Sequence, residues 1–224
     1  MNTLTCRPIT PAVSAELDDR WQDSAACLSV GGDAFFADTV RGEKAARRVC
    51  TGCPVIGVCL LDARTRESAA KERWGVAGGL SAEQRLALSW EERLHHHFPA
   101  PAVAQELLAP WWAGELRRLH RSGRTPDDIA QDLAGSVRPD AVTVRLALWW
   151  LGESGTRVRS RQDGESGTET ERITELYGPV VKRMRSMGAA RRDVAAYLGV
   201  NTGYAERIIT RLAAVARDQE GIAA

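Results

Sequence analysis

The sequence has no apolar run approaching the roughly 18 residues that a membrane helix needs. Its start, residues 1–19, also lacks the apolar segment of a secretory signal. The formal net charge is only +1 at pH 7, so no global field calls for nucleic acid. We therefore expect a cytoplasmic protein without a membrane partner, in a reducing compartment where clustered cysteines are more often metal ligands than disulfides.

Strand patterns and catalytic motifs are also missing. Alternation of β-branched residues is almost absent, whereas apolar residues recur at helical spacing throughout. There is no Gly-rich phosphate loop, and the four histidines all lie between His95 and His120, away from the cysteines. A C-x-x-C reductase would need a thioredoxin-like βαβ context. We predict an all-α chain that is not an enzyme.

What the sequence does have is a cysteine set. Four of its five cysteines follow the spacing C-x22-C-x2-C-x5-C, and they are Cys27, Cys50, Cys53 and Cys59. Cys6 lies apart from them in a Pro/Thr-rich start. Thiolates are soft ligands that select iron–sulfur clusters or zinc over hard cations. Structural zinc usually shows two C-x2-C pairs and this chain has one, while Pro54 after Cys53 matches the Cys-Pro ending of some ferredoxin runs. Spacing alone leaves both metals open.

A block of about sixty residues surrounds the cysteines. It comprises Trp21 through Cys27, Asp33-Ala34-Phe35-Phe36, Ala46 to Cys50, Cys53-Pro54-Val55, Cys59-Leu60 with Ala63, and the glycine turn Trp74-Gly75-Val76-Ala77-Gly78-Gly79-Leu80. This block resembles the WhiB-like family of actinobacterial transcriptional regulators. The resemblance implies a four-iron four-sulfur cluster held by Cys27, Cys50, Cys53 and Cys59, with zinc as the alternative.

The resemblance also implies a partner, the C-terminal region of the primary sigma factor of RNA polymerase. The residues expected to contact it are Trp21, Phe35, Phe36, Trp74, Gly78 and Gly79. One departure bears on this contact, because Ala77 stands where the family's turn carries a tryptophan. The cluster would either sense oxygen or nitric oxide or serve only as a scaffold for docking. We expect its loss to unfold residues near 20–80 and to leave the C-terminal helices folded.

Two breaks divide the chain. One is the Pro-bearing run at residues 95–101, and the other is residues 152–170, rich in Gly, Ser, Glu and Arg without a hydrophobic face. We predict a small four-Cys helical domain followed by two helix-turn-helix-like units. The expected parts are a flexible N-terminus 1–19, the metal domain 20–94, a hinge 95–110, a first unit 111–152, a flexible linker 153–171, a second unit 172–215 and a tail 216–224.

The two units repeat each other at an offset of 65 residues. Residues 116–123 align with 181–188, and Asp128-Ile129-Ala130 aligns with Asp193-Val194-Ala195. In the second copy we predict a helix over 191–198, a turn at Gly199, and a cap at Asn201 or Thr202 for the next helix. The first copy should hold one extra turn residue, with Pro139 in the first turn of its second helix.

A helix-turn-helix places the start of its second helix in the major groove of DNA. In the second copy the candidate base contacts are Asn201, Thr202, Gly203, Tyr204, Glu206 and Arg207, and the candidate phosphate contacts are Lys182, Arg183, Arg185, Arg191 and Arg192. Residues 178–211 carry seven basic and two acidic side chains. The first copy has no net charge, and its candidate contacts are Arg138, Asp140, Thr143 and Arg145.

The sequence therefore predicts a DNA-binding transcriptional regulator of the bacterial cytoplasm, associated with the nucleoid, that docks on the sigma factor. The alternatives are a zinc-stapled helix-turn-helix protein without polymerase contact and an adaptor whose helical repeats bind other proteins.

Overall fold

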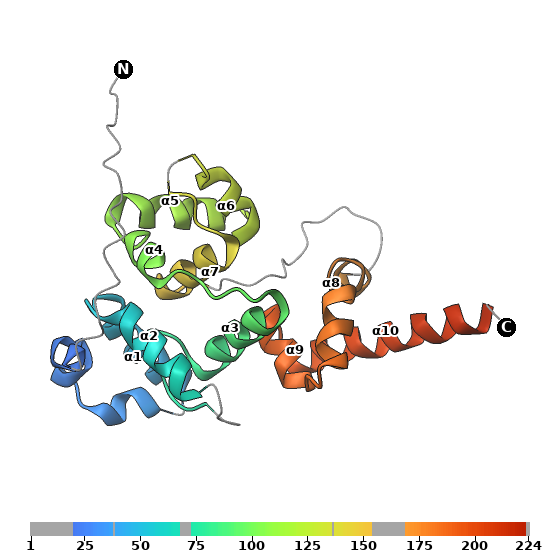
Figure 1. The fold of residues 1–224 in the computed structure, drawn as a ribbon, viewed down its shortest axis with the longest axis horizontal. Helices are drawn as coiled ribbons and strands as arrows, with labels where there is room; N and C mark the ends of the chain where they lie inside the picture. The colour runs from blue at the N-terminus through green and yellow to red at the C-terminus, as the bar shows by residue number, and fades with distance from the viewer. Residues whose placement is uncertain (1–19, 38, 68–72, 136, 154–168, 223–224) are drawn as a thin grey trace, which may run out of the picture. The chain divides into compact units, whose positions relative to one another are not determined.

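The computed structural model describes residues 20–37, 39–67, 73–135, 137–153 and 169–222 (Figure 1). Their regular elements are helices, and the β contact found among them is an isolated bridge between Ala77 and Leu80. The all-α prediction is confirmed. None of the described helices is long and apolar enough to cross a membrane. Cys6, the predicted N-terminus 1–19 and most of the predicted linker lie outside the described residues.

The chain divides into two compact units. The first comprises Met1–Ala82 and Pro99–Glu153, and the second comprises Glu83–Phe98 and Ser154–Ala224. The first unit holds three short 3-10 helices, η1 (Trp21–Ser24), η2 (Ala26–Ser29) and η3 (Gly32–Phe36), and then α1 (Val40–Thr51), α2 (Ile56–Glu67), α4 (Pro101–Glu106), α5 (Pro110–Arg121), α6 (Pro126–Leu133) and α7 (Ala141–Trp150). The second unit holds α3 (Ala82–His95), α8 (Glu169–Ser186), α9 (Arg191–Leu198) and α10 (Thr202–Ile222).

The first unit joins the cysteine segment to the first helical copy. Its apolar core includes Phe35 of η3, Ala46 of α1, and Ile56 and Leu60 of α2. The residues predicted as a hinge contain α4, because Pro101 at its first position has a backbone already suited to a helix. Helix α4 packs against both α2 and α7. The boundary expected near residue 95 therefore does not separate the cysteine segment from α4–α7.

The 65-residue repeat recurs in the helix bounds. Helices α6 and α9 both have eight residues at that offset, and α5 and α8 end at the equivalent residues Arg121 and Ser186. In the second copy, Gly199 takes the predicted left-handed turn with φ 72°, and the Asn201 side chain caps α10 by accepting from the Tyr204 N–H at 2.8 Å. Both predictions are confirmed.

The turn predicted for the first copy is wrong. Residues 134–140 separate α6 from α7, whereas only residues 199–201 separate α9 from α10, so the first copy has four extra turn residues rather than one. Pro139 precedes the helix instead of entering it. A proline disfavours helical backbone in the residue before it, and Arg138 has φ 50°. Asp140 then caps α7 by accepting from the Thr143 N–H.

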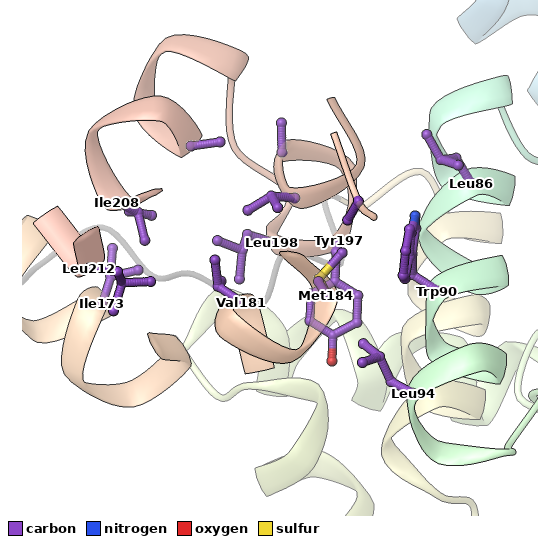
Figure 2. Packing of buried hydrophobic residues seen from close by; sticks show 14 residues of the cluster. Leu86, Trp90, Leu94, Ile173, Val181, Met184, Tyr197, Leu198, Ile208 and Leu212 are labelled. Atoms are coloured by element: carbon purple, nitrogen blue, oxygen red, sulfur yellow. The ribbon is translucent and has the colours of Figure 1, made fainter. Parts of the chain in front are cut away.

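Helix α3 packs on the second copy. Leu86, Trp90 and Leu94 of α3 lie in one apolar cluster with residues of α8, α9 and α10, and Figure 2 shows Trp90 and Leu94 beside Met184 and Tyr197. The domain boundaries predicted from the sequence place α3 in the metal domain. Helix α10 also continues to Ile222, through most of the predicted tail (Figure 1). The second unit is thus a helical trio, α8–α10, with α3 added to its core.

Candidate metal centre and nucleic-acid interface

The four predicted ligands come from the segment that links η2, α1 and α2. Cys27 lies in η2, Cys50 in the last turn of α1, Cys53 in the short connection that follows, and Cys59 in the first turn of α2. All four are free, half-buried thiols, and no disulfide joins them. Helix α1 is fixed at its other end by Thr39, whose hydroxyl accepts from the Gly42 N–H at 3.0 Å. The fold brings the widely spaced Cys27 to the other three.

The four thiols line one cavity of about 650 Å³. Its other walls include Trp21, Phe35, Phe36, Trp74 and the glycine turn. Within the described part of the chain, no three His, Cys, Asp or Glu side chains converge closely enough to hold a single metal ion. What the four thiols share is this one cavity.

Backbone N–H groups point at the thiol sulfurs. The Gly78 N–H donates to Cys59 Sγ at 3.2 Å, and the Ala26 N–H donates to Cys53 Sγ at 3.5 Å. Burial raises the pKa of the Cys50 thiol to about 11, while a hydrogen bond from the Gly79 backbone opposes the rise. Three of the four sulfurs thus accept from the backbone, an arrangement that stabilises thiolate ligands and tunes the potential of iron–sulfur clusters.

The glycine turn that supplies two of these donors is tightly enclosed. Gly75, Gly78 and Gly79 all have positive φ, from 55° to 71°. A Cβ on Gly78 would lie 2.5 Å from Leu60 Cα, and one on Gly75 would lie 2.4 Å from the Phe35 carbonyl oxygen. The Val76 N–H also donates to that carbonyl at 2.8 Å. Only glycine permits this approach of the turn to η3 and α2.

The residues predicted to contact a partner fall into two groups. Phe36 and Trp74 are 64% and 70% exposed, and both line the mouth of the cysteine cavity with the half-buried Trp21. Phe35 is buried in the core, and Gly78 and Gly79 are buried beneath neighbouring side chains. An approaching protein would therefore meet Phe36 and Trp74 first.

Three residues near the cysteines were not anticipated. Arg47 and Thr51 of α1 donate to the carbonyl oxygens of Trp149 and Trp150, at 2.5 Å and 2.8 Å. The Trp150 indole N–H donates to the Gly78 carbonyl oxygen at 2.8 Å. The end of α7 is thereby attached to the walls of the cysteine cavity. The first two contacts join residues 102 and 99 positions apart, and the third joins residues 72 positions apart. No local spacing could therefore have indicated them.

The candidate nucleic-acid interface lies on the second unit. The predicted phosphate contacts Lys182, Arg183, Arg185, Arg191 and Arg192 are all exposed, as are Thr202 and Arg207 at the start of α10. The Arg207 guanidinium stacks on the Tyr204 ring at 4.8 Å from its centroid. Such stacking holds a guanidinium in a defined direction. The basic side chains thus face solvent on the helices that a helix-turn-helix presents to DNA.

Several predicted contacts have structural partners inside the unit, and one of them is the Arg185 guanidinium, which donates to the Ala189 carbonyl oxygen. The Asn201 side-chain oxygen is engaged as the cap of α10, so it is not free for the two-point pairing with adenine that needs both amide oxygen and nitrogen. Arg191 pairs with Glu206 at 3.2 Å, with both side chains exposed. An exposed pair of this kind is weak and can be exchanged for a phosphate at little cost.

The equivalent helix of the first copy is not available to DNA. Nine residues of α7, from Val142 to Trp150, are buried. Thr143 accepts from the Ala100 N–H at 3.0 Å, and buried Arg145 stacks on the Trp149 ring at 4.7 Å. A buried helix cannot enter a groove, whereas the start of α10 is exposed.

Comparison with known proteins identifies the first part of the chain. The family model described as "Transcription factor WhiB" matches residues 21–88. Transcriptional regulator WhiB2 of Mycobacterium tuberculosis is 35% identical over 81 residues, which are 36% of this chain and 86% of that protein. WhiB2 of Mycolicibacterium smegmatis is 37% identical over 71 residues, or 32% of this chain and 52% of the relative. WhiB2 of Bifidobacterium longum is 34% identical over 76 residues, which are 34% of this chain and 73% of that protein.

No solved structure matches the chain. The family match includes all four cysteines, the aromatic residues at the cavity mouth and the glycine turn, and it ends before α4. The alignment with WhiB2 of Mycobacterium tuberculosis covers most of that relative's length. This alignment and the family match establish that the chain belongs to the WhiB family of transcriptional regulators.

Proposed function

We propose that this regulator carries a four-iron four-sulfur cluster on Cys27, Cys50, Cys53 and Cys59, docks on the primary sigma factor of RNA polymerase, and binds DNA through α9 and α10. One observation carries the proposal: four free thiols line a single cavity and three of their sulfurs accept backbone N–H groups. When bound, the cluster supplies redox and nitric oxide chemistry. The protein's residues hold it, shield it and present it to a partner.

The family match favours a cluster over zinc. Four thiolates are a soft donor set that fits iron as well as zinc, so metal analysis has to separate the two.

The exposed aromatic residues support sigma-factor docking. Phe36 and Trp74 lie at the mouth of the cysteine cavity, together with exposed Leu28. Large aromatic side chains that become buried at the centre of a protein interface contribute much of its binding energy. Trp74 would take the place of the tryptophan that Ala77 replaces in the turn. Changes at the cluster would then reach the partner directly, because the same cavity wall carries both sets of residues.

Metal analysis tests the proposal. After anaerobic purification we expect a brown protein with about four irons and four sulfides per chain, the composition of the cluster that four cysteines hold. A pull-down with the C-terminal region of the sigma factor then tests docking. A colourless protein with one zinc per chain would refute the cluster and leave a zinc-stapled DNA-binding protein.

DNA binding by the second unit makes a separate prediction. Arg207→Ala should weaken binding to a specific DNA site by about 1–3 kcal/mol, because an arginine at this position can pair with a guanine edge. The measurement is a fluorescence anisotropy titration over a salt series, in which phosphate contacts give a steep loss of affinity.

The matched control is Arg217→Ala. It removes the same charge from an exposed arginine of α10 nearly three turns further along, and it should leave specific affinity almost unchanged. Equal losses in the two variants would show that Arg207 acts only through its charge. The absence of DNA binding at any salt concentration would favour the alternative of an adaptor whose helical repeats bind other proteins.

A further inference from the structure

The last residue of α7 contacts the backbone that faces the cysteines. Trp150 is 2% exposed, and its indole N–H donates to the Gly78 carbonyl oxygen at 2.8 Å. The N–H of the same glycine donates to Cys59 Sγ at 3.2 Å. Gly78 therefore connects Trp150 to Cys59. Its carbonyl oxygen accepts from the indole, and its N–H donates to the thiol sulfur.

The indole ring also sets the position of the turn by direct packing. A Cβ on Gly79 would lie 2.7 Å from Trp150 Cδ1 and 2.7 Å from Ile56 Cδ1. The turn is thus enclosed between the ring on one side and α2 on the other. A backbone held on two sides keeps its N–H groups aimed in one direction.

A second attachment fixes the tryptophan itself. The carbonyl oxygens of Trp149 and Trp150 accept from Arg47 and Thr51, which lie on α1 on either side of Cys50. These carbonyls are among the last of α7, beyond the bonds within the helix, and that of Trp149 also accepts from the Gly152 N–H at 3.0 Å. The helix end is therefore anchored to the element that carries one thiol, while its side chain braces the turn that contacts another.

We propose that Trp150 is a positioning residue of the metal centre: its indole N–H fixes the Gly78 peptide so that the N–H of this peptide donates to Cys59. This role rests on the proposed cluster ligation by Cys59. It assigns a function to the first helical copy, whose second helix supports the metal centre instead of reading DNA. Trp150 lies outside the residues that the family model matches.

The test compares Trp150→Phe with Trp111→Phe in the 224-residue chain. Phenylalanine keeps an aromatic ring at position 150 and removes the N–H donor. Trp111 lies in the same unit and is 72% exposed, so its replacement is a matched control. Loss of the visible absorption in air should be roughly three- to tenfold faster in Trp150→Phe than in the native chain, because outer hydrogen-bond partners hold the ligands. The control should match the native rate.

The midpoint potential of the cluster gives a readout that a general loss of stability would not move. A weaker N–H donation to Cys59 leaves more charge on the sulfur, so the potential of Trp150→Phe should be more negative than that of Trp111→Phe. Thr51→Val, which removes the hydroxyl donor to the Trp150 carbonyl, should shift both readouts in the same direction by less. It provides a second test if Trp150→Phe does not fold.

The possible outcomes separate this role from the proposed function. Iron-loaded protein with equal rates and potentials in the two tryptophan variants would overturn the role of Trp150 and leave the cluster intact. Zinc without iron in the native chain would refute the cluster. The role would then be judged by zinc release to a chelator, with faster release from Trp150→Phe supporting it and equal release overturning it.

Discussion

Cys59→Ser should leave the protein without iron and unfold the first unit while the second unit stays folded. A serine hydroxyl is a harder donor than a thiolate and a poor ligand for iron in a sulfur site. Binding of a structural metal contributes on the order of 10 kcal/mol in small thiolate domains, which is comparable to the whole stability of a typical domain. The part of the apolar core beside the cysteines, around Phe35, Ile56 and Leu60, holds few large side chains, so it should not compensate for the loss.

Hydrogen exchange measured by mass spectrometry gives the extent of unfolding. Because α4–α7 lie in the same compact unit as the cysteines, protection should be lost in residues 141–150 as well as near 20–80. Helices α8, α9 and α10 should keep theirs. Cys6→Ser is the control, since it removes a thiol outside the ligand set. Native protection of residues 20–80 in iron-free Cys59→Ser would contradict the idea that the metal stabilises this unit.

The helices themselves were largely predictable from the sequence. The bounds of α9 and the turn at Gly199 follow from apolar spacing and one glycine, which act within a few residues. The placement of α3 was not predictable in this way. Its apolar residues Leu86, Trp90 and Leu94 indicate a buried face, but only the folded chain shows that this face meets Met184 and Tyr197 (Figure 2).

The same distinction between local patterns and long-range contacts applies to the candidate site. The spacing of the cysteines and the glycines identified the thiols and the turn, because both patterns are local. The hydrogen bond from the Trp150 indole to Gly78 joins residues 72 positions apart, and no sequence periodicity predicts such a contact. One signal in the sequence could have indicated that α7 is buried: from Ala141 to Trp150 it has apolar residues on all sides, which is typical of a helix enclosed by protein.

The second helices of the two copies differ in the character of their surfaces. At α10 the outward positions carry Thr202 and Arg207, which leave the helix polar on one side. At α7 the corresponding surface is apolar and covered, and the turn that precedes it is longer. The repeat in sequence therefore predicts the repeat in helices, while the burial of the second helix differs between the copies.

Gly78→Ala should destabilise the first unit by roughly 2–5 kcal/mol and reduce its iron content sharply. The added Cβ would lie 2.5 Å from both Cα and Cβ of Leu60 and 2.8 Å from its backbone nitrogen. Because two of these atoms belong to the backbone of α2, no side-chain rotation relieves the contact. Forcing an extra carbon into such a site costs about 1–3 kcal/mol, and φ 55° adds about 1–2 kcal/mol for a residue with a Cβ.

The measurement is urea unfolding followed by circular dichroism, with iron analysis of the same samples. Gly52→Ala is the matched control, because it adds one methyl group between Cys50 and Cys53 where a Cβ meets nothing within 4 Å and φ is −91°. The control should retain iron and native stability. Equal behaviour of the two variants would show that the turn can move away from α2, and then the N–H donors could not be fixed against Cys59. A loss confined to Gly78→Ala would instead tie the metal centre to the close approach of the turn and α2.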